Sequence, residues 1–223
     1  MKTRLLLFAA AVVALLFVAS AGHASMQDDV DQALSIIERF GEIPETAIPP
    51  AVMRDAKGVA IFGMTKAGFV VSGRGGTGVV LARTPTGWSG PSAIGTGGLG
   101  VGFQAGVQVT EHVMILNTPE AIKAFTQGTN FTLGANLSVA VGPVGRSAEA
   151  GVSPRAAIYT YSRSQGIFAG VSLEGTAVAT RYEANEEYYG KPVYPADILE
   201  GKVPPPPDAQ KLLEALAKYS DGR

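Results

Sequence analysis

The chain has 223 residues, a formal net charge of −1 at pH 7 and a hydrophobic fraction of 46%. Nucleic-acid-binding proteins normally carry a strong basic excess, so this balance argues against nucleic acid as a partner. The chain has no cysteine, which excludes disulfides and thiolate metal sites, and its 28 glycines indicate a β-rich globular protein.

The N-terminal segment has the features of a cleaved signal peptide. Lys2 and Arg4 precede an apolar run from Leu5 to Ala21, and small residues follow at the spacing that a signal peptidase reads. A retained membrane anchor is the alternative, since the run is close to the minimum length for spanning a bilayer. The acidic residues that follow favour cleavage. We therefore expect residues 1–24 to be removed and residues 25–223 to be exported, either to the periplasm or into the medium.

Two short helices are expected at the start of the mature chain. From Asp28 to Phe40 the apolar residues recur at helical spacing and form one stripe. Pro49 and Pro50 then supply a first-turn proline for a second helix, which ends near Ala56.

From Lys57 the pattern changes to short apolar runs punctuated by glycine, which predict successive β-strands. The runs cover residues 58–64, 68–72 and 79–83. The glycine-rich segment 74–78 is expected to be a tight connection between two of these strands.

The segment from Trp88 to Gly102 is rich in glycine, and beyond Gly97 apolar residues alternate strictly as far as Val109. A period of two indicates a strand with one buried side, and its glycine face predicts close packing against another strand or a ligand. Residues 95–100 also satisfy the dinucleotide-binding pattern, but that pattern requires a helix after the glycines. Because a strand follows instead, we expect no nucleotide cofactor.

The second half of the chain contains further helix and strand signals. Thr118, Pro119 and Glu120 mark the start of a helix. Strands are predicted over residues 133–141, 156–161 and 167–180, and a proline run at 204–207 precedes an amphipathic C-terminal helix. The sequence thus predicts a single α+β domain, β-rich, with mainly antiparallel glycine-rich strands and short helices at both ends.

Side chains suited to catalysis are scarce. His112 is the one histidine of the mature chain, and we expect it to be an ordinary turn or surface residue near the end of a strand. No serine lies in a nucleophile elbow, and Glu186 and Glu187 are adjacent and therefore point apart. No clustered ligands suggest a metal. We expect neither an enzyme nor a cofactor or metal site.

Isolated basic residues are the remaining candidates for ligand contacts. Arg74 lies in the glycine-rich segment, Arg146 follows a rigid turn at 142–145, and Arg163 is flanked by serines. Arginine with neighbouring hydroxyl and N–H donors suits phosphate recognition. Together with Lys66, these residues are the candidate contacts to a lipid head group. For each of them, a solvated charge at a strand end is the alternative.

An ordered set of segments resembles the SYLF domain family. The set runs from about Ile48 to Tyr219 and comprises residues 66–69, 72–79, 88–102, 115–118, 132–137, 141–146 and 159–175. This family includes eukaryotic lipid- and actin-associated proteins and many exported bacterial proteins. The resemblance implies binding of membrane phospholipids, phosphoinositides in the eukaryotic members, and no established catalytic activity.

The expected function is therefore that of an exported, non-enzymatic phospholipid-binding domain at the cell envelope or a membrane surface. An N-terminal amphipathic helix engages the membrane in some family members, but here Asp28, Asp29 and Asp31 make that helix acidic. We therefore expect the core domain to hold the lipid. The alternative is a structural or protein-interaction module of the envelope, with a protein partner and no lipid ligand.

Overall fold

The computed structural model describes residues 24–42, 48–128, 130–142, 156–165, 173 and 175–221, with the backbone alone at 68–71, 99–106, 164 and 165. The helices are α2 (Met26–Glu42), α3 (Pro50–Asp55), α4 (Pro119–Thr126), α6 (Tyr182–Tyr189), α7 (Pro195–Leu199), the short η1 (Pro207–Ala209) and α8 (Gln210–Asp221). The strands are β1 (Gly58–Thr84), β2 (Gly87–Trp88), β3 (Ser92–Leu116), β4 (Phe131–Thr132), β5 (Val139–Val141), β6 (Ile158–Gln165) and β7 (Ala177–Thr180). The predicted α+β domain with helices at both ends is confirmed. The predicted signal peptide lies outside the described residues, apart from Ala24.

The strands form one sheet. Its order is β2-β1-β3-β6-β5, with β7 paired to β3 and β4 paired to β7. Every pair of these strands is antiparallel except β5 with β6. The prediction of a mainly antiparallel sheet is therefore confirmed.

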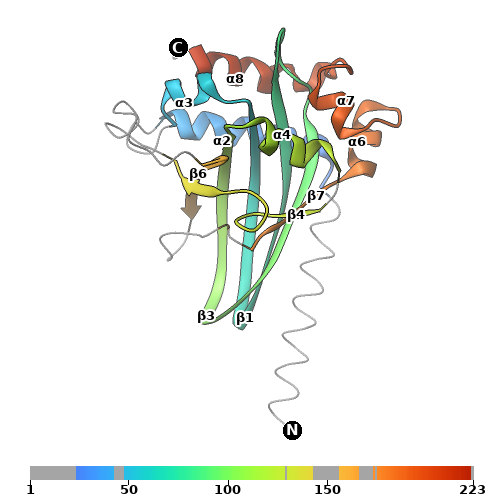
Figure 1. Cartoon of the computed structure of the whole chain (residues 1–223). Coiled ribbons are helices and arrows are strands. Elements are labelled where there is room, and N and C mark those ends of the chain that lie inside the picture. The colour runs from blue at the N-terminus through green and yellow to red at the C-terminus, as the bar shows by residue number, and fades with distance from the viewer. Residues whose placement is uncertain are drawn as a thin grey trace.

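β1 and β3 have 27 and 25 residues, far more than an ordinary strand, and each folds back on itself. They pair with one another along their length, with an irregularity between Phe69 and Val71. The amide of Arg83 donates to the carbonyl oxygen of Lys57 over 2.7 Å, which places the end of β1 beside its start. Figure 1 shows both strands running to a lower end and returning. We call this end, residues 68–71 and 99–106, the free end of the sheet.

The segment 74–78 lies within the returning half of β1 and pairs with residues 94–98 of β3. The prediction of a tight connection was therefore wrong. These glycines permit close backbone approach instead: a Cβ at Gly76 would overlap the carbonyl oxygen of Gly63, and a Cβ at Gly78 would overlap that of Ile61. Glycine inside a strand often marks such an approach, and here the approach is between the two halves of β1.

Two hydrophobic clusters cover the two faces of the sheet. Apolar residues of α2, α3 and α8 pack against one face, which we call the α2 face: Ile36, Ile37, Phe40, Met53, Leu212, Leu216, Val59, Ile61, Val113 and Ile115. Residues of α4 and α7 pack against the opposite, α4 face: Ala121, Phe125, Leu199, Phe62, Met64, Met114 and Leu116. Alternate residues of β1 and β3 thus enter different clusters, as the period of two requires. Figure 1 shows the described helices gathered at one end of the sheet, opposite the free end.

The local predictions for helices succeeded better than those for the later strands. Thr118 caps α4 by accepting a hydrogen bond from the amide of Ala121 over 3.2 Å. The predicted strand over 133–141 is wrong, because a turn with Gly134 at φ 83° interrupts it and leaves β5 as its last part. Most of the predicted strand 167–180 lies outside the described residues, and β7 is its described end.

Contacts on the α2 face join the first described helix to late parts of the chain. Tyr219 Oη accepts from the amide of Ile48 over 2.9 Å and donates to the carbonyl oxygen of Phe40 over 3.1 Å. The carboxylate of Asp29 is buried and accepts from Thr77 Oγ1 over 2.6 Å and from Arg181 Nη1 over 2.5 Å. Within the described ranges, no helix is both long enough and apolar enough to cross a membrane.

Candidate functional site

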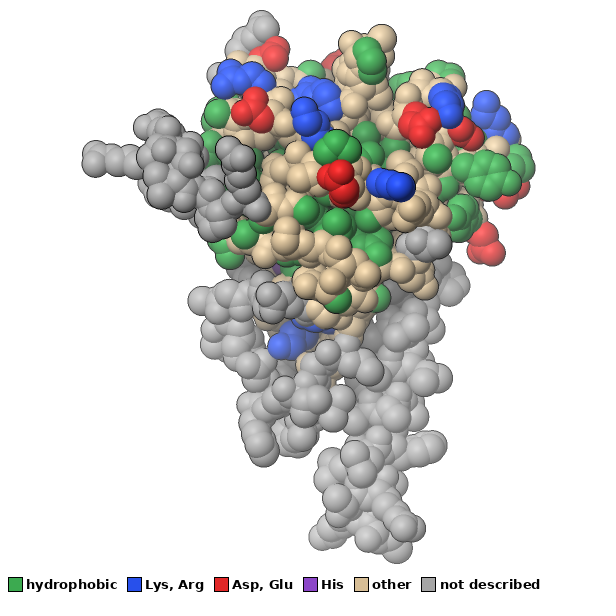
Figure 2. All heavy atoms as spheres, viewed as in Figure 1, with side chains coloured by type: hydrophobic (Ala, Val, Ile, Leu, Met, Phe, Trp, Pro, Cys, Tyr) green, Lys and Arg blue, Asp and Glu red, His purple; other side chains and the backbone are tan. Residues whose placement is uncertain are grey.

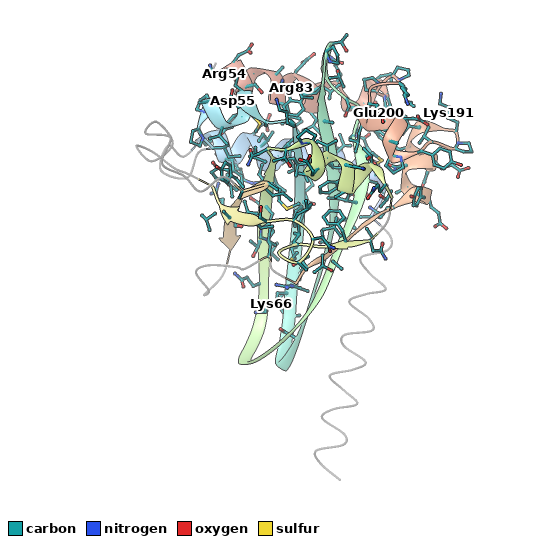
Figure 3. The ribbon with its side chains drawn as sticks, viewed as in Figure 1. Arg54, Asp55, Lys66, Arg83, Lys191 and Glu200 are labelled. Carbon is teal, nitrogen blue, oxygen red and sulfur yellow. The ribbon has the colours of Figure 1, made fainter. Side chains whose placement is uncertain are left out.

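Lys66 and Arg74 lie on the α4 face of the sheet, on the two halves of β1. Lys66 is on the outgoing half of β1 and pairs with Gln108, and Arg74 is on the returning half and pairs with Gly98. The two halves of β1 approach one another closely where Gly63 lies beside Gly76. Figure 3 shows Lys66 at the lower part of the sheet, far from the other labelled residues.

Arg74 is half-buried, and its side chain lies across a glycine. A Cβ at Gly98 would stand 2.6 Å from Arg74 Nε, and a Cβ at Gly175 would stand 3.8 Å from its Nη2. Burial lowers the pKa of Arg74, but a guanidinium stays charged at neutral pH. The sequence predicted that the glycine face of β3 packs closely against either a strand or a ligand. In the structure, Gly98 on this face makes room for the side chain of Arg74.

Buried polar residues of β3 continue this face toward the core. Gln108, Thr110 and His112 occupy alternate positions and are 5%, 2% and 0% exposed. Their partners on β1 are Lys66, Met64 and Phe62, so the α4 face changes from apolar beside α4 to polar near the free end. We call Lys66, Arg74, Gln108, Thr110 and His112 the polar cluster. In the sequence, Gln108 lies on the face of the alternating segment opposite its apolar residues, but nothing there indicates a role for it.

His112 is fully buried, which corrects the prediction of a turn or surface residue. Its ring stacks on Phe62 with centroids 5.0 Å apart, and its Nδ1 lies 2.8 Å from Ser162 Oγ. Nε2 is buried and has no hydrogen-bond partner among the described residues. Burial, and then the charge of Arg74, lowers the pKa of His112 to about 4. A base with so low a pKa is poorly matched to proton transfer near pH 7, so the pair with Ser162 does not favour catalysis.

Arg163 lies on the α2 face, so the sheet separates it from Lys66 and Arg74. It pairs with Glu111 of β3, and its Nη1 donates to the carbonyl oxygen of Arg39 in the last turn of α2 over 3.4 Å. Arg39 in turn forms an ion pair with Glu111 at 2.6 Å. Arg146 lies outside the described residues. Among the predicted contacts, Lys66 and Arg74 thus lie on one face of the sheet and Arg163 on the other.

The contact between Arg163 and α2 predicts a stabilising role. A cation beside the last carbonyls of a helix contributes about 0.5–1 kcal/mol, and Arg163→Ala should lower the free energy of unfolding by that amount. Urea denaturation measures the loss, and Arg163→Lys, which keeps the charge, should recover most of it. Unchanged stability combined with loss of vesicle binding would instead make Arg163 a lipid contact.

Other concave surfaces do not contain these cations. An open groove beside the start of α4 is lined by Asn117, Thr118, Asn136, Ser138 and Tyr159, among others. The amides of its two asparagines are already hydrogen-bonded, one to Ala156 and one to the backbone of Thr132. In the part of the chain that the structure describes, no group of three or more histidine or carboxylate side chains could hold a metal ion.

The fold is a single glycine-rich α+β domain with one curled, mainly antiparallel sheet. The Ysc84 family, described as "Las17-binding protein actin regulator", matches residues 97–219. The chain is similar to SH3 domain-containing YSC84-like protein 1 of Homo sapiens, with 46% identity over 205 residues, covering 88% of this chain and 60% of that protein. It is also similar to LAS seventeen-binding protein 3 of Saccharomyces cerevisiae, with 44% identity over 202 residues, covering 86% of this chain and 44% of that protein.

The chain therefore belongs to the Ysc84/SYLF family, as its ordered motifs indicated. It spans 60% or less of the length of these two relatives.

Proposed function

We propose that this protein binds anionic phospholipid at a membrane surface without catalysing a reaction, and that it does so after export, at the cell envelope. The observation that carries the proposal is that Lys66 and Arg74 lie on one face of the sheet, on the two halves of β1 that run to its free end. Lysine and arginine are the side chains that bind phosphate groups most strongly, arginine through its planar fork and lysine as a point charge.

The charge distribution along the chain supports an anionic ligand at this end. Residues 56–110, which include all of β1, contain no aspartate or glutamate, although the whole chain has a net charge of −1. Figure 2 shows basic side chains at the lower end of the described surface, whereas red and blue side chains are mixed at the helical end. Arg83 lies at that helical end, where it stacks on Trp88 and donates to Ser220 Oγ. Within residues 56–110, the basic side chains nearest the free end in the sequence are Lys66 and Arg74.

Neutralising either cation should weaken binding to anionic vesicles. A basic residue near an anionic surface contributes about 1 kcal/mol, so we expect Lys66→Gln and Arg74→Gln each to weaken binding about fivefold. Co-sedimentation with vesicles of phosphatidylcholine and phosphatidylglycerol measures this change. Lys191→Gln is the matched control, because Lys191 is exposed at the helical end of the molecule.

The dependence of vesicle binding on salt and on lipid charge also tests this proposal. Rising salt should weaken the binding, because exposed charges are screened. Equal binding to phosphatidylcholine alone, or full binding by both cation variants, would contradict the proposal.

A protein partner is the second candidate. The family description and the name of the yeast relative both refer to binding of another protein. Val107 and Val109 are 64% and 45% exposed, and exposed apolar patches often mark protein interfaces. This candidate predicts no vesicle binding. It also predicts that a cross-linker attached at Val107→Cys, in a chain that otherwise lacks cysteine, captures one envelope protein and that the same label at Ala217→Cys does not.

A further inference from the structure

Two buried polar atoms on the α4 face have no hydrogen-bond partner among the described residues. They are Nε2 of His112 and Oγ1 of Thr176, and both residues are 0% exposed. Thr176 is on this face because Val178, two positions further, belongs to the α4-face cluster. Buried polar atoms in native proteins are nearly always hydrogen-bonded, so an orphaned one indicates a partner that the site binds, either water or a ligand.

Arg74 is the charged residue that lies near both of them. A Cβ at Gly175 would stand 3.8 Å from Arg74 Nη2, and Thr176 is the next residue along the chain. The charge of Arg74 also acts on His112, whose pKa it helps to lower. Gly98 leaves room for the Arg74 side chain, since a Cβ there would stand 2.6 Å from Nε. A guanidinium, a buried hydroxyl and a buried imidazole thus belong to one neighbourhood.

The ring of His112 is oriented by its other contacts. Its Nδ1 lies 2.8 Å from Ser162 Oγ on β6, so Nε2, at the far side of the ring, faces away from β6. The returning half of β1, which carries Arg74, lies on that side: the ring stacks on Phe62, and a Cβ at Gly78 would stand 2.5 Å from the Cβ of Phe62. When the serine hydroxyl donates to Nδ1, the neutral ring carries its proton on Nε2 and can donate there.

We propose that Arg74, Thr176 and His112 form a binding site for one phosphate group, with the guanidinium, the hydroxyl and Nε2–H as its donors. This inference rests on the proposed function and identifies the residues that hold the head-group phosphate. Gly175 is exposed and Arg74 is half-buried, so the site opens to solvent beside them. A lipid head group and free phosphate present the same oxygen atoms, and the experiment below distinguishes these two sources.

A phosphate group suits these donors better than a single water molecule does. All three side chains can donate, whereas one water accepts two hydrogen bonds at most. The oxygens of a phosphate accept from several donors at once, and the planar fork of arginine matches them in geometry. Hydrogen bonds to a charged group are also stronger where water is excluded, as it is around His112 and Thr176.

Thr176→Val is the sharpest test, because it replaces the buried hydroxyl by a methyl group. It should weaken co-sedimentation with phosphatidylcholine–phosphatidylglycerol vesicles, or calorimetric binding of inorganic phosphate, at least about tenfold, since a hydrogen bond to a charged group is lost. His112→Phe should act in the same direction. Thr180→Val is the matched control, because it makes the same change at the other end of β7, where Thr180 pairs with Ile94. Circular dichroism checks that each variant is folded.

Nuclear magnetic resonance of the unsubstituted protein tests the site without any loss of stability. The Nε2 signal of His112 is the imidazole signal that His112→Phe removes. This signal should move when inorganic phosphate or phosphatidylglycerol vesicles are added at constant ionic strength, because the proposed ligand bonds to that atom.

The outcomes separate this inference from the proposed function. Vesicle binding that Thr176→Val and His112→Phe leave unchanged, with an unmoved Nε2 signal, would show that water alone fills the site. That result would overturn this inference and leave the proposed function standing. Vesicle binding that Thr176→Val weakens would support a head-group phosphate as the ligand. Binding of inorganic phosphate that Thr176→Val weakens, without vesicle binding, would support the site for free phosphate and overturn the proposed function. Binding of neither would overturn both.

Discussion

Gly76→Ala is expected to lower the free energy of unfolding by about 2–4 kcal/mol, whereas Gly73→Ala should change it by no more than about 0.5–1 kcal/mol. The reason is the fold-back of β1. A Cβ at Gly76 would overlap the carbonyl oxygen of Gly63 and approach the Cα of Met64, and these backbone atoms cannot rotate away. A Cβ at Gly73 would meet no described atom within 4 Å, although it lies on the same half of the same strand.

Urea denaturation of the two variants is a direct comparison, because both make the same chemical change. Alanine at position 73 even restricts the unfolded chain slightly more than glycine does, which favours the folded state. Gly78→Ala should resemble Gly76→Ala, since a Cβ there would overlap the carbonyl oxygen of Ile61. Equal stabilities for the variants at positions 73 and 76 would show that the two halves of β1 do not lie against one another.

The second large effect concerns the dependence of stability on pH, and it involves Asp29 and His112. Burial raises the pKa of Asp29 from 3.8 to about 6, although Thr77 and Arg181 hold its carboxylate. The folded state therefore binds this proton more tightly than the unfolded chain does. The stabilising contribution of Asp29 is complete below about pH 4 and is lost as the pH rises through about 6.

His112 has the opposite dependence. Burial and the charge of Arg74 lower its pKa from 6.5 to about 4, so the folded state disfavours the protonated ring. Its contribution is present above about pH 6.5 and is lost as the pH falls toward 4. Between about pH 4 and pH 6, the contributions of Asp29 and His112 to the free energy of unfolding therefore change in opposite directions.

Single substitutions should reveal how Asp29 and His112 each make the free energy of unfolding depend on pH. With Asp29→Asn, stability should fall as the pH is lowered from about 6.5 to about 4, by as much as about 3 kcal/mol. With His112→Phe, which keeps a ring beside Phe62, stability should rise over the same window. Urea denaturation at a series of pH values measures both slopes, and the double variant should show neither. Parallel curves for the parent and both single variants would contradict this account.

Short-range features of the fold could be predicted from the sequence. The alternation beyond Gly97 predicted a strand and β3 confirms it, because a period of two depends only on neighbouring residues. The caps and prolines at Thr118 and Pro50 located the starts of α4 and α3 for the same reason. The family motifs are also contiguous segments, so they could be found without knowledge of the fold.

The features that depend on distant pairing could not be predicted. Glycine at 74–78 is equally compatible with a turn and with close packing between strands, and the partner that decides between them is Gly63, on the other half of β1. The burial of His112 depends on contacts with Phe62 and Ser162 on other strands, and the position of Arg163 depends on where α2 ends. Lys66 and Arg74 could be predicted as isolated cations, but their position on one face of the sheet follows from the fold-back of β1.

The contacts between the two ends of the described chain have a consequence for folding kinetics. Tyr219 bonds to Ile48 and Phe40, which are 171 and 179 positions away, and Arg181 bonds to Asp29 across 152 positions. Closing loops of this size before any contact is gained slows folding, as in other proteins of high contact order. A chain emerging from the ribosome cannot complete the cluster beneath α2 until α8 has been synthesised. The domain should therefore fold only after α8 has been synthesised, and deletion of α2 or α8 should prevent folding.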